Sequence, residues 1–579
     1  MLISGNQNQG KRIEKDGTKT IIVFNLIGLT SMLRFKQRLV LISVLSLSFN
    51  IIPLCSQPDN RFLPFDWVQY RHSGAVTSLS EGYSYLYIGT ETGGVKRYNL
   101  FSNNFDEPIT IAQGLKENLI TAIHFDHGTG ILWVCTPNYI HYSYTREGDW
   151  SFLEIINTGL TRYDRIREIG SSEDYIWIKG NSIFVKLDRS SAVVAGMFPF
   201  PDQLQINWSG SYSNRWGNDF NNIINNYPVM GGWISSGNSY IDQLGRSIEI
   251  MSTLIGRHGD VWVGCDNGIL LQGRQSDEIF YPLPTSVPVE DVFGMVISDE
   301  LLYVGGIKIS QGFGVSWLNK NTNETYTFDF ESNINMTPTP IYSILDGKNT
   351  LWAGGKNCLL VYDKNDKFWR TLEQNDGIPE GNVTNIAGDS EDIWIASDEG
   401  IRRLDSKSWK EKPVGFEYLF NSLKIYDLEL IDKTIWIASR SGLFLYNSSQ
   451  PQLINAKDVG KVGFDGFIIN VTALNYSDQS LYAVCDAGVI NFDFYEKEWI
   501  LLFPVSFYQD KIITSMEVNN KYLFLGTNDG IIRINKRNGY IREYLFPFIG
   551  TVNQMKLDKN YIWLGTTSGL IKFKWTREQ

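Results

Sequence analysis

The chain has few of the residues that mark disulfide scaffolds, basic proteins or histidine-based catalysts. Its 579 residues include 5 cysteines, 18 prolines and 5 histidines. Acidic residues (63) outnumber basic residues (52), and the formal charge of -11 argues against a polyanion such as nucleic acid as a partner, because phosphate binding needs clustered basic side chains. After the first 57 positions no apolar run reaches the roughly 20 residues of a membrane span, so we expect a mature chain without one.

Four of the cysteines are expected to be buried free thiols. They stand in strand-like apolar runs and show no Cys-x-x-Cys pairing or metal-ligand spacing. Four cysteines in so long a chain do not make a disulfide scaffold, although two disulfides remain possible in an exported protein. These cysteines are Cys135, Cys265, Cys358 and Cys485.

Residues 1–57 have the features of a mis-called extension followed by a signal peptide. Three basic residues between positions 34 and 38 precede an apolar stretch from Leu39 to Leu54, and Met32 offers a translation start just before them. Cys55 would suit lipidation, but Leu54 stands where a lipidation motif has a small residue. We therefore expect cleavage near Ser56 and an extracytoplasmic location, whether periplasmic, cell-surface or secreted.

A repeated unit dominates the rest of the sequence. Asp392–Leu404 and Tyr561–Phe573 are two clear copies, each with an apolar-aromatic-apolar run, a small pair of residues, a polar turn and a glycine. Eleven copies carry a marker aromatic residue, spaced by 39 to 49 residues except for one gap of 85. The markers are Tyr87, Trp133, Trp177, Trp262, Tyr303, Trp352, Trp394, Trp436, Tyr482, Phe524 and Trp563.

Each copy predicts a β-hairpin whose first strand is buried on both faces. The turns supply the positive-φ positions that glycine and asparagine tolerate, and an almost wholly apolar strand is typical of one stacked between neighbouring sheets. Short strands before and after each hairpin bring the count to four per repeat, which is the blade of a β-propeller. The predicted fold is all-β, with about 11–12 four-stranded blades in tandem propellers and the marker aromatics buried between blades.

The repeats resemble those of the two-component regulator propeller (Reg_prop) family, whose signature is an Ile-Trp-Ile-Gly-Thr strand followed by a turn and Gly-Leu. The resemblance covers about residues 65–579 and implies similarity to the sensor region of hybrid two-component regulators and to the propellers of PorZ-like type IX secretion proteins. No kinase or DNA-binding segment follows the last repeat, so sensor-kinase activity is not implied. The Trp-Asp ending of WD repeats and the paired glycines of kelch repeats are absent.

Two divisions of the repeats into rings are possible. In the first, residues 58–325 form one propeller and residues 326–579 a second, because Asn319–Pro340 is polar and has the composition of a linker. In the alternative, one ring is made from both termini and the other is inserted within it. That arrangement predicts antiparallel pairing of residues 66–70 with residues 570–574, which would remove two exposed strand edges together.

The gap of 85 residues contains an insertion at about residues 190–249, or alternatively a degenerate twelfth blade. Loops carry function more often than scaffold strands, and tryptophan and asparagine suit stacking on sugars or on partner surfaces. A flap that covers a blade edge is the equally weighted structural alternative. The candidate ligand-binding residues are Trp208, Trp216, Trp233, Asn207 and Asn214.

Local motifs for catalysis, cofactors or metals are lacking, so we name no catalytic residue, cofactor or metal site. His124 and His127 are the two histidines close in sequence, and we interpret them as satisfied residues at a strand end. The sequence thus favours an exported, non-enzymatic binding or scaffold protein that recognises a partner protein or an extracellular polysaccharide. The alternative is an extracytoplasmic glycan-active enzyme, a lyase or hydrolase, because paired carboxylates need no local motif.

Overall fold

The computed structural model describes residues 61–578, except 211–223, 238, 258, 275, 308–313, 329–338, 422 and 509–510. The expected signal peptide and its cleavage site lie outside these residues. In the described part the chain is built from antiparallel sheets joined by short turns. Its helical segments are short, and the 3-10 turns are η1 (Ile111–Gln113), η2 (Ile155–Thr158), η4 (Gln374–Asp376), η5 (Glu417–Leu419), η6 (Ala456–Asp458), η7 (Val505–Phe507) and η8 (Trp575–Glu578).

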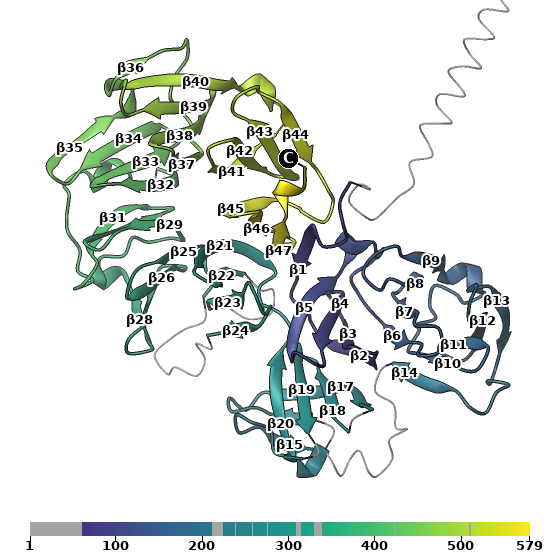
Figure 1. Cartoon of the computed structure of the whole chain (residues 1–579). Coiled ribbons are helices and arrows are strands. Elements are labelled where there is room, and N and C mark those ends of the chain that lie inside the picture. Colours follow the sequence, from purple (N-terminus) through teal and green to yellow (C-terminus); the bar gives the residue numbers. More distant parts are fainter. Residues whose placement is uncertain are drawn as a thin grey trace, which may run out of the picture. The chain divides into compact units, whose positions relative to one another are not determined.

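The first four repeats form the amino-terminal group of sheets (Figure 1). Each repeat contributes four consecutive strands, and each strand pairs with the next. The strands are β2 (Val76–Glu81), β3 (Tyr85–Thr90), β4 (Val95–Asn99), β5 (Asn104–Ile109), β6 (Ala122–Phe125), β7 (Leu132–Cys135), β8 (Tyr139–Ser143), β9 (Ser151–Glu154), β10 (Glu168–Ser171), β11 (Tyr175–Lys179), β12 (Phe184–Asp188), β13 (Val194–Phe198), β17 (Ser247–Ile255), β18 (Val261–Cys265), β19 (Ile269–Arg274) and β20 (Ile279–Pro284).

The other seven repeats form the carboxy-terminal ring of sheets. Their strands are β21 (Asp291–Ser298), β22 (Leu301–Ile307), β23 (Ser316–Asn319), β24 (Thr325–Thr327), β25 (Ser343–Asp346), β26 (Thr350–Gly354), β27 (Leu359–Asp363), β28 (Phe368–Leu372), β29 (Val383–Gly388), β30 (Asp392–Ser397), β31 (Gly400–Asp405), β32 (Ile425–Ile431), β33 (Thr434–Ser439), β34 (Gly442–Asn447), β35 (Gln450–Asn455), β37 (Ala473–Ser477), β38 (Ser480–Cys485), β39 (Gly488–Asp493), β40 (Glu498–Pro504), β41 (Ile513–Val518), β42 (Tyr522–Thr527), β43 (Gly530–Asn535), β44 (Ile541–Tyr544), β45 (Val552–Asp558), β46 (Tyr561–Thr566) and β47 (Gly569–Phe573). The short β36 (Lys461–Val462) adds to β40.

The inner strands of these seven sheets contact one another in sequence order and close into a ring. β21 contacts β25, and the contacts continue through β29, β32, β37 and β41 to β45, which contacts β21. An inner strand touching its two neighbours around a closed circuit is the arrangement of propeller blades. The chain therefore folds as tandem β-propellers, as the repeats predicted.

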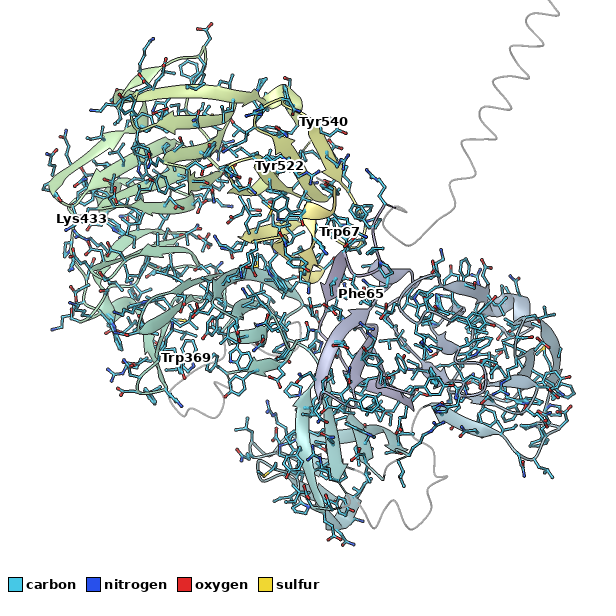
Figure 2. The ribbon with its side chains drawn as sticks, viewed as in Figure 1. Phe65, Trp67, Trp369, Lys433, Tyr522 and Tyr540 are labelled. Carbon is cyan, nitrogen blue, oxygen red and sulfur yellow. The ribbon has the colours of Figure 1, made fainter. Side chains whose placement is uncertain are left out.

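An amino-terminal strand completes the seventh sheet of the ring. β1 (Trp67–Tyr70) pairs antiparallel with β47, with Trp67 opposite Phe573 and Tyr70 opposite Leu570 (Figure 1). The Trp67 ring (Figure 2) is fully buried, stacks on Phe573 with 3.7 Å between ring centroids, and lies 5.8 Å from the Tyr544 ring. The predicted pairing of the two chain ends is confirmed.

These contacts favour the second division of the chain into rings. β21–β24, residues 291–327, contact both the last sheet through β45 and the next sheet through β25. A boundary near residue 325 would separate β21–β24 from that circuit. We therefore propose the alternative arrangement, in which one ring is made from both ends of the chain and residues 76–284 are inserted between β1 and β21.

The marker aromatics lie where the repeat predicted, on the second strand of each sheet. All are buried except Tyr303, which is half-buried on β22. Second strands such as β7, β18 and β30 are buried at every position, because sheets pack against both of their faces. Cys135, Cys265, Cys358 and Cys485 are buried and free, which confirms the expected buried thiols.

The described residues of the 190–249 segment add strands to neighbouring sheets. β14 (Asn207–Gly210) pairs antiparallel along β10, whereas β15 (Ile234–Ser236) and β16 (Ser239–Ile241) extend the sheet of β17–β20. This arrangement favours an insertion over a separate twelfth blade. No helix in the described part of the chain has the length and apolar character needed to cross a membrane.

Candidate functional site

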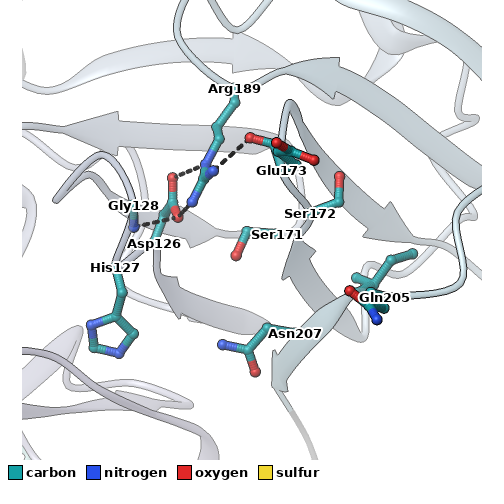
Figure 3. Close-up of a pocket in the computed structure, with 10 residues that line it drawn as sticks. Asp126, His127, Gly128, Ser171, Ser172, Glu173, Arg189, Gln205 and Asn207 are labelled. Carbon is teal, nitrogen blue, oxygen red and sulfur yellow. Dashed lines mark hydrogen bonds and ion pairs between the residues drawn. The ribbon is translucent and has the colours of Figure 1, made fainter.

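A polar cavity of about 430 Å³ lies in the amino-terminal group of sheets (Figure 3). It forms where the ends of β6, β10 and β12 meet the segment that leads into β14. Pockets of this volume are typical of sites for small molecules. The lining residues are Asp126, His127, Gly128, Ser171, Ser172, Glu173, Arg189, Gln205, Ile206 and Asn207.

An ion pair fixes one wall of the cavity. Arg189 Nε donates to Asp126 Oδ2 at 2.7 Å, a second guanidinium nitrogen donates to Oδ1, and Arg189 Nη1 donates to the Glu173 carbonyl at 2.6 Å. The Asp126 carboxylate also accepts from Thr129 Oγ1 at 2.5 Å and from the Gly128 N–H at 3.1 Å. Bidentate pairing of this kind gives a rigid, oriented wall.

The same hydrogen bonds keep the Asp126 carboxyl group ionised and engage both of its oxygens. Burial alone would raise the pKa of this carboxyl group, but the bonds from Arg189, Thr129 and Gly128 hold the pKa below its usual range. A carboxylate whose oxygens already accept four hydrogen bonds is poorly placed to take a proton from a substrate. Asp126 therefore shapes the cavity and is not a suitable general base.

His124 lies behind the cavity wall in a chain of hydrogen bonds. Its Nε2 is 2.9 Å from Ser171 Oγ and its Nδ1 is 2.5 Å from Ser209 Oγ. Ser209 Oγ donates to the Ile123 carbonyl, so we assign the ring proton to His124 Nδ1. Burial lowers the pKa of His124 to about 4, so the ring is neutral at pH 7. Both ring nitrogens have partners, as expected for a satisfied histidine.

His127 reaches the cavity with an imidazole that is also neutral at pH 7. Its ring packs against Phe125, with 4.8 Å between centroids, and against Tyr83 at 5.6 Å. Burial, together with the charge of Arg257, lowers the pKa of His127 to about 4. The cavity thus presents uncharged polar groups, one internal ion pair and the Glu173 carboxylate. Among the described residues no group of three or more His, Cys, Asp or Glu side chains is arranged to hold a metal ion.

The candidate residues from the sequence are distributed over several places. Asn207 lines the cavity and is exposed. Trp208 is half-buried on β14 with its ring 5.9 Å from that of Phe184, whereas Trp233 packs 6.2 Å from Tyr240 against the β17–β20 sheet. Trp216 and Asn214 lie outside the described residues. The structure therefore places Asn207 in the cavity lining, Trp208 next to it on β14 but outside the lining set, and Trp233 against another sheet.

Most of the cavity was not predicted from the sequence. Ser171, Ser172 and Arg189 follow ordinary strands of the third repeat, and Gln205 lies in the insertion without any local motif. The closest available signal is the pair His124 and His127 at the end of β6, which the sequence alone suggests are satisfied strand-end histidines. The convergence of the lining residues in one cavity depends on the pairing of β14 with β10.

Neither a family model nor a curated protein matches the chain. Among solved structures, PorZ, a surface component of the type IX secretion system of Porphyromonas gingivalis, is 11% identical, with 88% of this chain and 87% of that chain covered and a TM-score of 0.51. The extracellular domain of BT4673 from B. thetaiotaomicron is 14% identical over 86% of this chain and 70% of that chain, with a TM-score of 0.39.

The comparison with PorZ supports the fold. At 11% identity the likeness to PorZ supports the tandem propeller architecture and nothing more specific. Because no family model matches, membership of the two-component regulator propeller family stays a prediction from the repeats.

Proposed function

We propose that the chain is an extracytoplasmic propeller protein that binds a hydroxyl-rich ligand, a segment of an extracellular polysaccharide, in the cavity of the amino-terminal group. The observation that carries this proposal is the composition of the cavity. Gln205 and Asn207 offer amide groups that both donate and accept hydrogen bonds, and Ser171 and Ser172, whose hydroxyls donate to His124 Nε2 and to the Tyr175 carbonyl, offer acceptor oxygens. Sugar hydroxyls need the same mixed donors and acceptors.

The internal ion pair favours binding over glycan cleavage. Glycosidases use two carboxyl groups that flank the scissile bond, one as acid and one as base or nucleophile. In this cavity Asp126 is held by Arg189 and Thr129, which leaves Glu173 as the second carboxylate of the lining set. A single available carboxylate fits recognition better than hydrolysis or lyase chemistry.

The extracytoplasmic location rests on two supports. The first is the expected signal peptide in residues 1–57. The second is the shared architecture with PorZ, which is described as a bacterial surface component. A polysaccharide at the cell surface would then meet the cavity without crossing a membrane.

A second candidate is a partner protein, favoured by the apolar edge beside β13. Residues 193–204 include five exposed large apolar side chains, and β13 is the last strand of its sheet. Clustered exposed apolar residues on a strand edge suit the addition of an extended segment from another protein. The five are Val193, Val194, Met197, Phe200 and Leu204, of which Phe200 is 77% exposed.

A glycan array probed with residues 58–579 tests the proposal. We expect binding to one class of oligosaccharide, and we expect Gln205→Ala and Asn207→Ala each to weaken it by about tenfold, the equivalent of one hydrogen bond to a bound ligand. Gln452→Ala is the matched control, because Gln452 is exposed on β35, in a different group of sheets. Binding that survives both cavity variants would contradict the proposal, and capture of a protein that is lost on Phe200→Asp would favour the second candidate.

A further inference from the structure

One serine of the cavity wall is hydrogen-bonded to a buried histidine. Ser171 is the last residue of β10 and lines the cavity, and Figure 3 shows its side chain among those of the other lining residues. The Ser171 hydroxyl donates to His124 Nε2 at 2.9 Å. A serine hydroxyl within hydrogen-bond reach of a neutral imidazole is the arrangement that activates a serine nucleophile, because the imidazole can take the hydroxyl proton while the oxygen attacks.

His124 is held in the tautomer that this chemistry needs. Ser209 Oγ lies 2.5 Å from His124 Nδ1 and donates its own proton to the Ile123 carbonyl, so it accepts the proton on Nδ1. His124 Nε2 therefore carries the lone pair that faces Ser171. The two serines come from β10 and β14, so the pairing of these strands fixes the orientation of the ring between them.

A side-chain amide stands beside the serine. Asn207 lines the cavity and lies directly opposite Ser171 in the antiparallel pairing of β14 with β10. Residues opposite each other in such a pair have side chains on the same face of the sheet, with about 4.5–5.5 Å between their Cβ atoms. An amide N–H at this position can donate to the oxygen of a carbonyl group that the serine attacks. A nucleophile, a base and a donor thus meet at one wall of the cavity.

The histidine is not a feature of the repeat. His124 lies on the inner strand β6, opposite the marker Trp133. The inner-strand residues opposite the other three markers of the amino-terminal group are Ser80, Gly170 and Leu254. Packing of these sheets therefore does not itself require an imidazole, and the imidazole is particular to a sheet that borders the cavity.

We propose that Ser171 removes acyl groups that are ester-linked to hydroxyls of the polysaccharide in the cavity. Cleavage of a glycosidic bond needs two carboxyl groups, whereas acyl transfer needs a nucleophile, a base and a donor for the carbonyl oxygen. That the alcohol part of the ester is a sugar rests on the proposed function. The reactivity of Ser171 rests only on His124 and Asn207.

The reaction has two steps that share the same base. In the first, Ser171 Oγ bonds to the ester carbonyl carbon while its proton passes to His124 Nε2, and the bond from that carbon to the sugar oxygen breaks as the oxygen takes the proton. In the second, water attacks the acyl-serine and gives a proton to His124 Nε2. The bond to Ser171 Oγ then breaks, the serine regains the proton, and the carboxylic acid leaves.

The surroundings of His124 predict the pH dependence of this reaction. Burial lowers the pKa of His124 to about 4, with Asp126 opposing the shift and His127 and Arg189 adding to it. The Nε2 lone pair is therefore available throughout the range from pH 5.5 to 7.5, and the rate of ester hydrolysis should be nearly constant there. So weak a base takes the serine proton slowly, so we expect slow turnover.

Covalent labelling of residues 58–579 with a fluorophosphonate tests for the reactive serine. The reagent forms an O–P bond with an activated serine and expels fluoride, and mass spectrometry of the peptides locates the label. We expect the label on Ser171, and its loss in Ser171→Ala. Ser449→Ala is the matched control, because Ser449 is exposed on the carboxy-terminal ring, and it should be labelled like wild type. Absence of label from Ser171 in the wild-type chain would overturn the proposal.

Release of acetate from O-acetylated xylan, glucomannan and pectin tests for the reaction, with p-nitrophenyl acetate as a simple ester. We expect hydrolysis to be lost in Ser171→Ala and to fall about a hundredfold in Asn207→Asp, which places a negative charge where the donor stood. Asn207 is exposed, so this variant should fold even where a change at the buried His124 would not.

The outcomes separate this proposal from the proposed function. Hydrolysis that is unchanged in Ser171→Ala overturns the acyl transfer, even when the glycan array shows binding. Release of acetate from none of the three polysaccharides overturns the sugar ester as the substrate class. A rate that falls with a midpoint near pH 6.5, as for an unperturbed histidine with a pKa of about 6.5, excludes His124 as the base. Labelling of Ser171 in a chain that binds no glycan supports the reactive serine and contradicts polysaccharide binding.

Discussion

The two groups of sheets use the same repeat but end in different ways. In the carboxy-terminal ring the last inner strand, β45, contacts the first, β21, and β1 completes the seventh sheet. In the amino-terminal group the contacts run from β17 through β2 and β6 to β10, and β10 then pairs with β14 from the insertion. The polar cavity therefore lies in the amino-terminal group, where the insertion interrupts the series of repeats.

The chemistry that joins neighbouring sheets is the same in both groups. In the amino-terminal group Ser252 Oγ donates to the Val76 carbonyl at 2.8 Å and Thr77 Oγ1 donates to the Ile120 carbonyl at 2.6 Å. In the ring Asn553 Nδ2 donates to the Val292 carbonyl at 2.9 Å, and Gln554 Oε1 accepts from the Met295 N–H at 2.6 Å. Polar side chains on inner strands thus bond to the next sheet in both groups, and the groups differ in how they close.

Removing β1, the strand that completes the seventh sheet, should have the largest effect on stability. That effect should be confined to the carboxy-terminal ring. Trp67 is fully buried against Phe573, so Trp67→Ala is expected to destabilise the ring by about 3–5 kcal/mol, as other buried tryptophan truncations do. Deletion of residues 58–72 should destabilise it further, because it removes the whole of β1. Differential scanning calorimetry should show the ring transition moving to lower temperature.

Hydrogen exchange supplies the control for this experiment. Inner strands β32 and β41 of the ring should lose protection in Trp67→Ala, whereas β7 and β11 of the amino-terminal group should keep it. An unchanged melting profile after the deletion would contradict closure by β1. Equal loss of protection in both groups would mean that they unfold as one unit.

The two groups should respond to pH in opposite directions. Burial raises the pKa of Asp427 to about 6 and that of Glu429 to about 7 in the ring, whereas burial lowers the pKa of His124 and of His141 to about 4 in the amino-terminal group. The folded ring binds more protons than its unfolded chain, so its stability should fall as the pH rises from about 4 to about 7. The folded amino-terminal group binds fewer protons, so its stability should fall as the pH decreases from about 6.5 to about 4.

Variants identify the groups responsible for each slope. Glu429→Gln should flatten the ring's response by about 1–3 kcal/mol across this pH window, since one pKa unit corresponds to about 1.4 kcal/mol. It should leave the response of the amino-terminal group unchanged. Thermal unfolding at pH 4.5, 5.5, 6.5 and 7.5, followed by hydrogen exchange in each group, measures both slopes. Parallel pH profiles for the two groups would refute the assignment.

The strand order of each sheet and the buried marker positions could be predicted from the sequence, because the same pattern recurs in eleven copies. Eleven copies fix the register of the marker strands, and the extra strand at Trp67 matched the strand missing after Phe573. Tyr303 is the marker that departs from full burial. The expected boundary near residue 325 relied on local composition and on the long spacing between two markers, and neither reports the contacts of β21 with β45.

The cavity could not be predicted from the sequence. Asp126, Ser171, Arg189 and Gln205 meet only because β14 pairs with β10, and no spacing rule encodes that pairing.

The smallest expected effects are those of Trp208→Ala and Trp233→Ala on stability and ligand binding. The comparison of these two variants tests whether the insertion takes part in binding. Trp208 lies over Gly170, where an added Cβ would approach the indole to 2.8 Å, and it shares β14 with the cavity residue Asn207. Trp208→Ala should loosen β14 from β10 and weaken polysaccharide binding about tenfold, with about 1–2 kcal/mol of lost stability. Trp233→Ala should lower stability by a similar amount through the Tyr240 contact and leave binding unchanged, because Trp233 packs against another sheet. Chemical denaturation and ligand titration of the two purified variants measure both quantities. If both variants lose stability and neither loses affinity, the insertion is a structural flap, and the cavity binds without it.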